Sequence, residues 1–260
     1  MDTMCLLAIA WNVHPRWQLV LAGNRDEFHA RPTATLAPWQ DRTGVMAGRD
    51  LQSGGTWAGI DVRGRMAVVT NVRDPAAIPG PDIHSRGQLT TDFLAGTLTA
   101  TAQAQALMGR AGDYAPFNLL LADTVSCEFV GNHPHARTRP LATGVHGLSN
   151  GDLDEPWPKV ERLKQAMSAW LDNGHDDPAL LWQALADESH AADTELPDTG
   201  VGLELERALS PAFIRGTAYG TRASTLIAID HDGTGWISER RFGLDGHFEG
   251  ETRLDIPRPQ

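Results

Sequence analysis

Apolar residues in the N-terminal part of the chain follow the pattern of buried β-strands. Residues 5–11 form a continuous apolar run, which is typical of a strand covered on both faces, and a second run covers residues 17–23. A proline-containing turn separates the two runs. We therefore predict a hairpin whose open end brings residues 24–27 close to Cys5.

The pattern then changes to helices and returns to strands at the end of the chain. The remaining predicted elements are strands at 56–62 and 65–71, helices from Ser85 and over 100–109, a strand at 117–122, a helix opened by Pro156 and Pro158, a helix from Asp177, and strands at 224–230 and 235–242. Polar, glycine-containing residues at 46–55 and 190–202 predict loops. This order favours one domain over 1–260, with two packed sheets and helices outside them.

Composition and charge narrow the class of protein. The 260 residues are 41% hydrophobic and 21% charged, as in an ordinary globular protein. A formal net charge of −11 repels nucleic acids and anionic lipids, so we expect neither as a partner. No stretch approaches the roughly 18 apolar residues that span a bilayer, and the start does not have the pattern of a signal peptide. With two cysteines and no CxxC pair, we expect a cytoplasmic protein without stable membrane insertion.

Cys5 is the first candidate for chemistry, because it follows Met4 directly. If Met4 were the start and were removed, the α-amine of Cys5, with an ordinary pKa of about 7.7–8.0, could accept the proton of its own thiol. Residues 1–3 would then be an extension or reflect an alternative start. The alternative is a buried cysteine in a core strand, where free cysteines are common.

The sequence Asn24-Arg25-Asp26-Glu27 places four polar side chains directly after an apolar strand. Alternation along a strand sends Asn24 and Asp26 to one face. It sends Arg25 and Glu27 to the other. One pair could reach Cys5, where a guanidinium would favour the thiolate and a carboxylate would orient the amine. The alternative is a solvated turn with a local ion pair.

Two asparagines and one arginine lie beside other predicted strands. Asn71 and Asn150 are candidates for donating an amide N–H to a developing oxyanion. Arg222 lies just ahead of a strand, where it could bind a substrate carboxylate in bidentate fashion. The alternatives are turn-forming asparagines and a surface ion pair.

The remaining motifs indicate no resident metal or cofactor. The glycines before Trp57 allow close backbone approach, but no Gly-Lys-Ser/Thr follows, so the loop is not a Walker motif. His133 and His135 are the one close pair among ten histidines, and the proline between them favours an irregular turn over a metal site. Trp57 either lines a pocket or fills the core.

These motifs occur together in one order, and in this combination the chain resembles the NRDE family, also called the transport and Golgi organisation protein 2 family. The motif that names the family is Asn24-Arg25-Asp26-Glu27. Other matches, nearly end to end, are Met4-Cys5-Leu6-Leu7, His14-Pro15, Ala47-Gly48-Arg49-Asp50, Gly54-Gly55-Thr56-Trp57, Thr70-Asn71, Phe117-Asn118-Leu119-Leu120, His146-Gly147-Leu148-Ser149-Asn150, Pro156-Trp157-Pro158-Lys159 and Tyr219-Gly220-Thr221-Arg222. The family pattern begins Met-Cys, which supports Met4 as the natural start.

The resemblance implies a fold and a set of roles. The family looks like a branch of the N-terminal-nucleophile hydrolases, α+β proteins with a four-layer αββα sandwich, and is most similar to penicillin V acylase and conjugated bile acid hydrolase. The nucleophile of that branch matches Cys5. Its two oxyanion amides match Asn71 and Asn150, and its late arginine matches Arg222.

The early arginine and carboxylate depart from the pattern of that branch. The branch has Gly-Arg-Asn-x-Asp, whereas this chain has Gly-Asn-Arg-Asp-Glu from residue 23. Arg25 and Asp26, the expected catalytic pair, are therefore shifted by one place, which exchanges faces on a strand. Asn24 and Glu27 occupy the aligned positions, and with Trp57 they are the candidate substrate-binding residues.

Two functions follow. The first is an amide hydrolase without a cofactor, in which the Cys5 thiolate attacks a non-peptide C–N amide of a small molecule. The second is a non-catalytic carrier of a hydrophobic ligand. The resemblance to eukaryotic members of the family implies a role in haem trafficking or in the handling of acyl-CoA and lipids. A haem carrier would need an axial ligand, for which Cys5, His14 and His29 are candidates.

Overall fold

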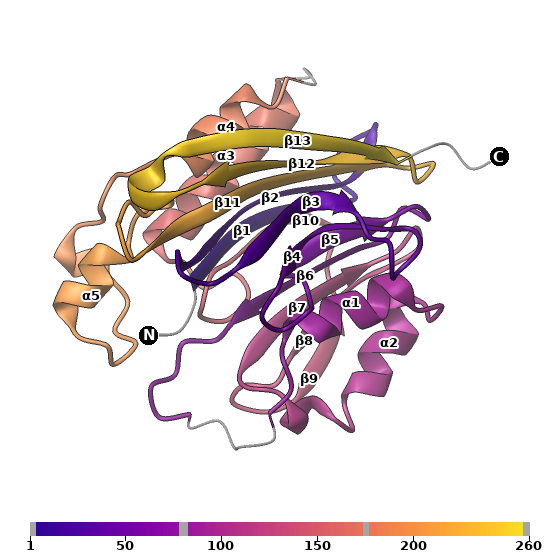
Figure 1. Ribbon diagram of the computed structural model, residues 1–260, viewed down its shortest axis with the longest axis horizontal. Helices are drawn as coiled ribbons and strands as arrows, with labels where there is room; N and C mark the ends of the chain where they lie inside the picture. The colour runs from indigo at the N-terminus through magenta and orange to yellow at the C-terminus, as the bar shows by residue number, and fades with distance from the viewer. Residues whose placement is uncertain (1–3, 78–82, 174–176, 257–260) are drawn as a thin grey trace.

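The computed structural model describes residues 4–77, 83–173 and 177–256, which form two antiparallel sheets flanked by helices (Figure 1). Sheet A has the strand order β10-β1-β2-β11-β12-β13, and sheet B has the order β3-β4-β5-β6-β7-β8-β9. The strands of sheet A are β10 (Gly144–Leu148), β1 (Met4–Trp11), β2 (Trp17–Phe28), β11 (Tyr219–Asp230), β12 (Gly235–Phe242) and β13 (Phe248–Ile256). Those of sheet B are β3 (Thr33–Pro38), β4 (Val45–Asp50), β5 (Ala58–Asp61), β6 (Met66–Asn71), β7 (Phe117–Ala122), β8 (Cys127–Gly131) and β9 (Arg137–Pro140).

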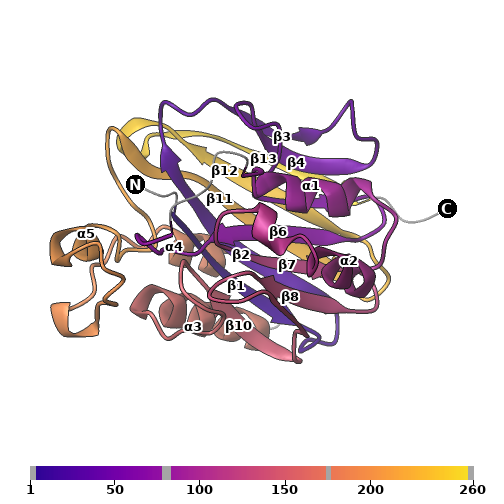
Figure 2. The ribbon, with the colours of Figure 1, turned by 90° about the horizontal axis from the view of Figure 1, so that it is seen from below.

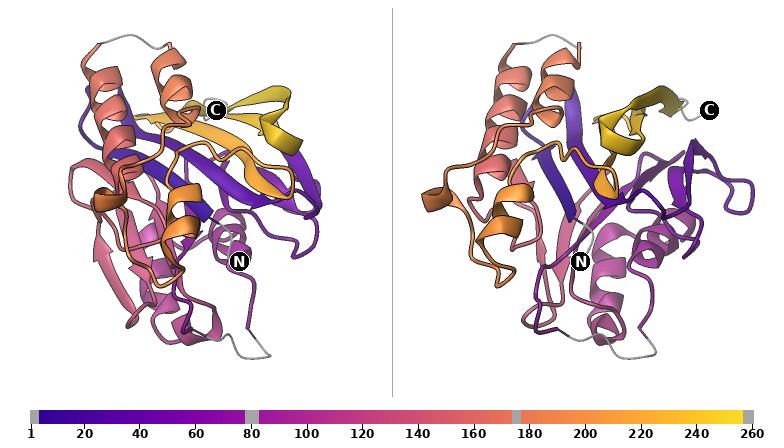
Figure 3. Two further views of the ribbon diagram at one scale, coloured as in Figure 1. Left: turned by 90° about the vertical axis from the view of Figure 1, so that its left-hand side faces the viewer. Right: turned by 60° about the vertical axis from the view of Figure 1, so that its left-hand side comes forward.

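Helices cover the outer face of each sheet. On sheet B lie α1 (Gly87–Ala95) and α2 (Ala100–Leu107) (Figure 2), and on sheet A lie α3 (Pro158–Asp172) and α4 (Ala179–Leu185), side by side in Figure 3. The short α5 (Leu203–Ala208) belongs to the segment that leads to β11. Three 3-10 turns complete the described elements: Ala111–Asp113, Asp193–Glu195 and Leu244–Gly246. Within the described ranges, no helix has the length and apolarity to cross a membrane.

Among the described residues, three large apolar cores define the layers, and a small fourth cluster surrounds Met4. Leu7 and Ile9 point into the core between the two sheets, whereas Leu6 and Ala8 point to the other face of β1 and pack against α3 and α4. A third core lies between sheet B and helices α1 and α2. Burial on both faces explains why residues 5–11 are continuously apolar. The resulting αββα sandwich confirms the predicted fold class.

The predicted hairpin of β1 and β2 is present, and its register positions the candidate site. Cys5 lies opposite Arg25, and Met4 lies opposite Asp26. Directly opposed residues of an antiparallel pair share a face. Cys5 and Arg25 therefore point toward sheet B, whereas Met4 and Asp26 point toward α3 and α4.

Strand β11 completes this end of sheet A from the other side of β2. Thr221 lies opposite Asp26, and Ala223 lies opposite Arg25. The register shifts between these two pairs, so Arg222 sits in a β-bulge without an opposite residue. A bulge redirects the side chain, which bears on the role of Arg222.

Candidate active site

Cys5 lies at the start of β1 with its side chain against a pocket of about 130 Å³. The residue is 4% exposed. Four other predicted site residues line the same pocket: Arg25, Glu27, Trp57 and Asn71. The remaining lining residues are Arg31, Asp50, Gly55, Thr56, Val69, Ser85, Arg86 and Gly87. The fold thus brings together predicted site residues that are up to 66 positions apart in the sequence, from both sheets.

The thiol of Cys5 is held in its neutral form. Burial raises its pKa from 9.0 to about 12, and the negative charge of Asp26 adds to this, while Arg25 opposes it. A thiol is a weak nucleophile compared with its thiolate. With Met4 attached, Cys5 therefore needs a base before it can attack a carbonyl carbon.

The backbone of Cys5 is fixed by the Ser149–Asn150 pair that follows β10. The amide nitrogen of Cys5 donates to Oδ1 of Asn150 at 3.3 Å, and Oγ of Ser149 donates to the Cys5 carbonyl at 2.8 Å. Nδ2 of Asn150 donates to the carbonyl of Asn71 at 3.0 Å. The Asn150 amide thus bridges the first residues of β1 and the end of β6. If Cys5 were the first residue, the same Oδ1 would face its α-amine.

Asp26 lies on the helix-covered face of sheet A, away from the thiol. It is completely buried, and one carboxylate oxygen accepts a hydrogen bond from Oγ1 of Thr221 at 2.6 Å. Burial raises the pKa of Asp26 to about 6, against the opposing influence of the Lys159 cation and the Thr221 hydroxyl. Its register partner is Met4, so Asp26 is close to the nitrogen side of Cys5 rather than to its sulfur.

The structure does not support a contact between Asn24 and a substrate in the Cys5 pocket. Asn24 is fully buried on the same face as Asp26. Its Nδ2 donates to the carbonyls of Leu185 and Ala212 at 2.8 and 2.7 Å, and its Oδ1 accepts from Ser224 at 2.6 Å. Both amide protons and the oxygen are thereby used. Asn24 instead ties β2 to the end of α4 and to β11.

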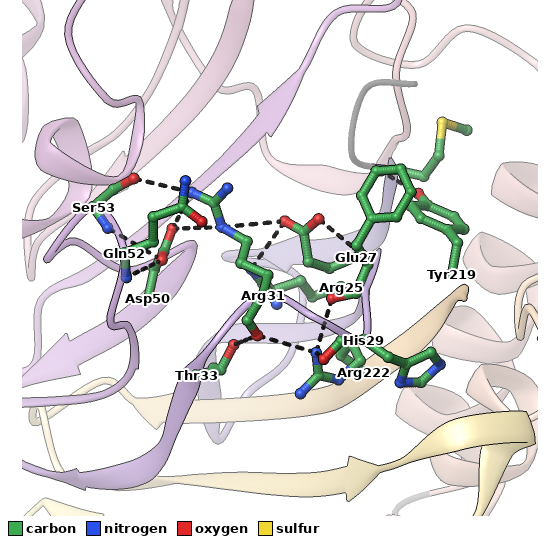
Figure 4. Close-up of polar contacts among 12 residues, drawn as sticks. Arg25, Glu27, His29, Arg31, Thr33, Asp50, Gln52, Ser53, Tyr219 and Arg222 are labelled. Carbon is green, nitrogen blue, oxygen red and sulfur yellow. Dashed lines mark hydrogen bonds and ion pairs between the residues drawn. The ribbon is translucent and has the colours of Figure 1, made fainter. Parts of the chain in front are cut away.

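Charged side chains around the pocket form a continuous network (Figure 4). Glu27 pairs with Arg25 at 3.2 Å and with Arg31 at 3.6 Å, and Arg31 pairs with Asp50 at 2.6 Å. Nη1 of Arg25 is buried and has no hydrogen-bond partner in the described part of the chain. With Arg86, which also lines the pocket, the described residues place three cations and two anions around it and leave a small excess of positive charge.

Arg222 supports the turn that follows β2 rather than lining the Cys5 pocket. Its Nη1 donates, at 3.0, 3.2 and 3.3 Å, to the carbonyl oxygens of Phe28, His29 and Arg31 (Figure 4). Its side chain lines a neighbouring pocket of about 100 Å³, which shares Arg25 and Trp57 with the Cys5 pocket. Arg222 therefore positions the segment that carries Glu27 and Arg31.

The candidate haem ligands are separated by the hairpin. Cys5 lies at its open end, whereas His14 lies in the turn at the other end, where its Nδ1 accepts from two backbone N–H groups. At about 3.3 Å per residue, the strand between them is roughly 20 Å long, so the two cannot ligate one iron. His29 is at the open end, with Nε2 3.1 Å from the carbonyl of Gly216. Among the described residues, no cluster of three or more His, Cys, Asp or Glu side chains could hold a metal.

The model of the Transport and Golgi organisation 2 family matches residues 4–243 of the chain. The chain belongs to this family. Its sequence is 32% identical over 259 residues to the Transport and Golgi organization protein 2 homolog of Bos taurus, with 91% of this chain and 92% of the relative covered. The Homo sapiens homolog is 29% identical over 257 residues, with the same coverage, and the Drosophila melanogaster protein is 26% identical over 279 residues, with 95% of each chain covered.

Solved structures show that this Transport and Golgi organisation 2 family member has an N-terminal-nucleophile hydrolase fold. The Caenorhabditis elegans ortholog of N-acylethanolamine-hydrolyzing acid amidase superposes with a TM-score of 0.53 at 12% identity, over 86% of this chain and 92% of that one. A mutant of conjugated bile acid hydrolase from Clostridium perfringens also gives 0.53, at 9% identity, over 98% and 95% of the two chains. At these identities the likeness concerns the fold alone.

Two residues near Cys5 were not among the sequence candidates. The hydroxyl of Tyr219 accepts from the backbone nitrogen of Met4 at 2.7 Å. Lys159, at the beginning of α3, is 3% exposed, and its Nζ donates to the carbonyl of Leu209 at 2.9 Å. The sequence did offer a hint of Lys159, since lysine is rare in this chain: only Lys159 and Lys164 are lysines among its 22 lysines and arginines.

Proposed function

We propose that this protein is an N-terminal-nucleophile amide hydrolase, that Cys5 is its nucleophile, and that it is active once the residues through Met4 have been removed. The observation that carries the proposal is the position of Cys5 on this fold. Its sulfur faces a pocket with Arg25 and Asn71, whereas its nitrogen faces Oδ1 of Asn150.

The reaction that we propose uses the two ends of Cys5. The free α-amine takes the thiol proton, and the sulfur attacks the amide carbonyl carbon to form a tetrahedral oxyanion. The Asn71 side chain, beside the sulfur in the pocket, donates to that oxyanion. The C–N bond then breaks, the ammonium returns its proton to the leaving amine, and a thioester remains. Water hydrolyses the thioester and releases the carboxylic acid.

The size and lining of the pocket favour a small polar amide over a large apolar ligand. Its volume of about 130 Å³ is below the roughly 300–1,000 Å³ of pockets that enclose drug-sized molecules. Arg25, Glu27, Arg31 and Asp50 all line it, and burying charged groups against an apolar ligand is unfavourable. These features support a hydrolase more than a carrier of haem or of an acyl chain.

The test begins with the intact mass of the protein made from its own gene. We expect a chain that starts at Cys5. This chain is then incubated with p-nitroanilides of acyl groups of increasing length, and release of p-nitroaniline is followed by absorbance. Acid quenching should trap the acyl group as a thioester on Cys5.

Cys127→Ser is the matched control, because Cys127 is also buried but lies in β8, away from the pocket. It should retain the activity, and Cys5→Ala should abolish it. A chain that keeps Met4 and never acquires an acyl group on Cys5 would refute the proposal.

A further inference from the structure

Lys159 occupies a place that is unfavourable for a cation. It lies in the first turn of α3, where the helix dipole is positive, and it is 3% exposed. Burial lowers the pKa of Lys159 to about 8. Within the described part of the chain, its hydrogen-bond acceptor is the neutral carbonyl of Leu209. A buried cation in such a place requires a nearby anion, because a lone buried charge is strongly destabilising.

Asp26 is the anion that most favours the charged form of Lys159, although the described part of the chain shows no ion pair within 4 Å between the two side chains. It is completely buried on the face of sheet A against which α3 packs. One of its oxygens accepts from Thr221, and Oδ2 has no hydrogen-bond partner among the described residues. Each of the two groups favours the charged form of the other.

The other charged groups around this pair are already matched. Within the described residues, Arg73 pairs with Glu206 at 2.6 Å and Arg25 pairs with Glu27 at 3.2 Å. Lys159 also lines a groove of about 550 Å³ between α3 and α4. Along this groove, Arg162 pairs with Asp187 at 3.5 Å and Arg215 pairs with Glu188 at 2.5 Å. Arg86 lies on the pocket side of Cys5 rather than on this face, and it donates to the carbonyl of Pro116 at 3.0 Å. On the helix-covered face, Asp26 and Lys159 act on each other electrostatically.

Asp26 and Lys159 lie on the N-terminal side of Cys5. The nitrogen of Cys5 carries Met4, and Met4 lies opposite Asp26. The Met4 side chain packs against Leu209, whose carbonyl is the acceptor for Lys159. Removal of Met4 would put the new α-amine at the edge of the Asp26–Lys159 pair.

We propose that Lys159 is a positioning residue that neutralises Asp26 beside the freed α-amine of Cys5 and so keeps this amine in its neutral, proton-accepting form. The inference rests on the proposed function. An unbalanced Asp26 carboxylate would hold the amine as an ammonium ion, which cannot take the thiol proton. The buried ammonium of Lys159 offsets that attraction without touching the substrate pocket.

The test measures how the reactivity of Cys5 depends on pH in a chain that starts at Cys5. Iodoacetamide alkylation of Cys5 is followed by mass between about pH 5 and about pH 10, and the midpoint of the rate profile is determined. Lys159→Met should raise the midpoint by about one pH unit, because a positive charge has been lost near the amine. Asp26→Asn should lower it, and the double variant should return it close to the wild-type value.

Lys164→Met is the matched control, because Lys164 lies on the same helix but is partly exposed and pairs with Glu161. It should leave the midpoint unchanged. Lys159→Gln keeps a donor for the Leu209 carbonyl and serves as the test if Lys159→Met does not fold.

Two outcomes would overturn the inference. A merely structural role would lower the melting temperature of the Lys159 variants without moving the midpoint. Shifts in the same direction for the Lys159 and Asp26 variants would likewise exclude a balancing pair. Failure of the proposed function looks different, since Cys5 in the wild-type chain would then be as inert as Cys127.

Discussion

The reactivity of Cys5 should depend on whether its nitrogen is free. In the chain that begins at Met1, burial raises the pKa of the thiol from 9.0 to about 12, and the negative charge of Asp26, on the other face of sheet A, adds to this. Removing the residues through Met4 supplies an amine with an ordinary pKa near 8, which can accept the proton. It also removes the side chain that covers this end of β1. We therefore expect Cys5 to be slow in the extended chain and fast in the chain that starts at Cys5.

The size of the difference follows from the pKa. A rise of three units lowers the thiolate fraction at neutral pH about 1,000-fold, equivalent to about 4 kcal/mol. The more basic thiolate is intrinsically about 20-fold more nucleophilic, since the Brønsted coefficient is roughly 0.4–0.5. The extended chain should thus react about 50-fold more slowly than a free cysteine, before its 4% exposure slows it further.

The assay is pseudo-first-order alkylation by iodoacetamide at neutral pH, with peptide mapping of the labelled site. Cys127 is the internal reference, because it is 2% exposed and burial raises its pKa in both forms of the chain. Equal rates for Cys5 in the two chains would show that the nitrogen is not the base. A Cys5 that reacts like a free cysteine in the extended chain would show that burial does not control the thiol.

Two further predictions concern stability. Arg65→Met should cost about 1.5–3 kcal/mol in urea unfolding, because Arg65 pairs with buried Asp61 at 2.7 Å and donates to carbonyls at the end of α1, whereas Asp61 keeps its ion pair with Arg63; a loss below about 0.5 kcal/mol would contradict this. Asp26 has a folded-state pKa raised from 3.8 to about 6, so its ionisation destabilises the fold as pH rises through this window. Relative to Asp26→Asn, the extended wild-type chain should therefore lose up to about 3 kcal/mol between pH 4 and pH 6, and parallel pH profiles would refute this.

Much of sheet A could be predicted from the sequence, because its central strands contain continuous apolar runs. β1 and β2 are apolar on both faces, and a short turn joins them, so the hairpin follows from local pattern alone. The prediction of a loop over residues 46–55 was wrong, since β4 covers Val45–Asp50. Gly48 lowers the strand signal there, but a Cβ at this position would lie 2.9 Å from Oε2 of Glu239, so the glycine serves a close contact with β12.

Strand β13 could not be predicted from its own sequence pattern. Phe248–Ile256 alternates exposed and partly buried residues and includes charged side chains, as suits an edge strand. Its strand conformation depends on pairing with β12. The pairing partner, rather than the residues themselves, makes this segment a strand.

Some residues of the candidate site could be predicted from local sequence pattern, and others could not. The register of one hairpin places Arg25 opposite Cys5, which alternation along a strand could anticipate. Lys159 and Tyr219 follow Cys5 by more than 150 residues in the sequence. The packing of α3 and β11 brings them near the N-terminal side of Cys5. No local pattern specifies such contacts, although the scarcity of lysine in an arginine-rich chain was a usable hint.

The one-place shift of the arginine and carboxylate has a physical consequence. At the end of β2, Arg25 and Glu27 point to the pocket, and Asp26 points to the helices. The sulfur of Cys5 therefore meets a guanidinium, which favours a thiolate, whereas its nitrogen lies on the side of a carboxylate that is balanced by Lys159. Both carboxylates nevertheless oppose ionisation of the thiol, Asp26 from the other face of the sheet and Glu27 from the pocket side. In the proposed mechanism, the alternation therefore places Arg25 on the side of the Cys5 sulfur and places Asp26, with Lys159, on the side of the α-amine.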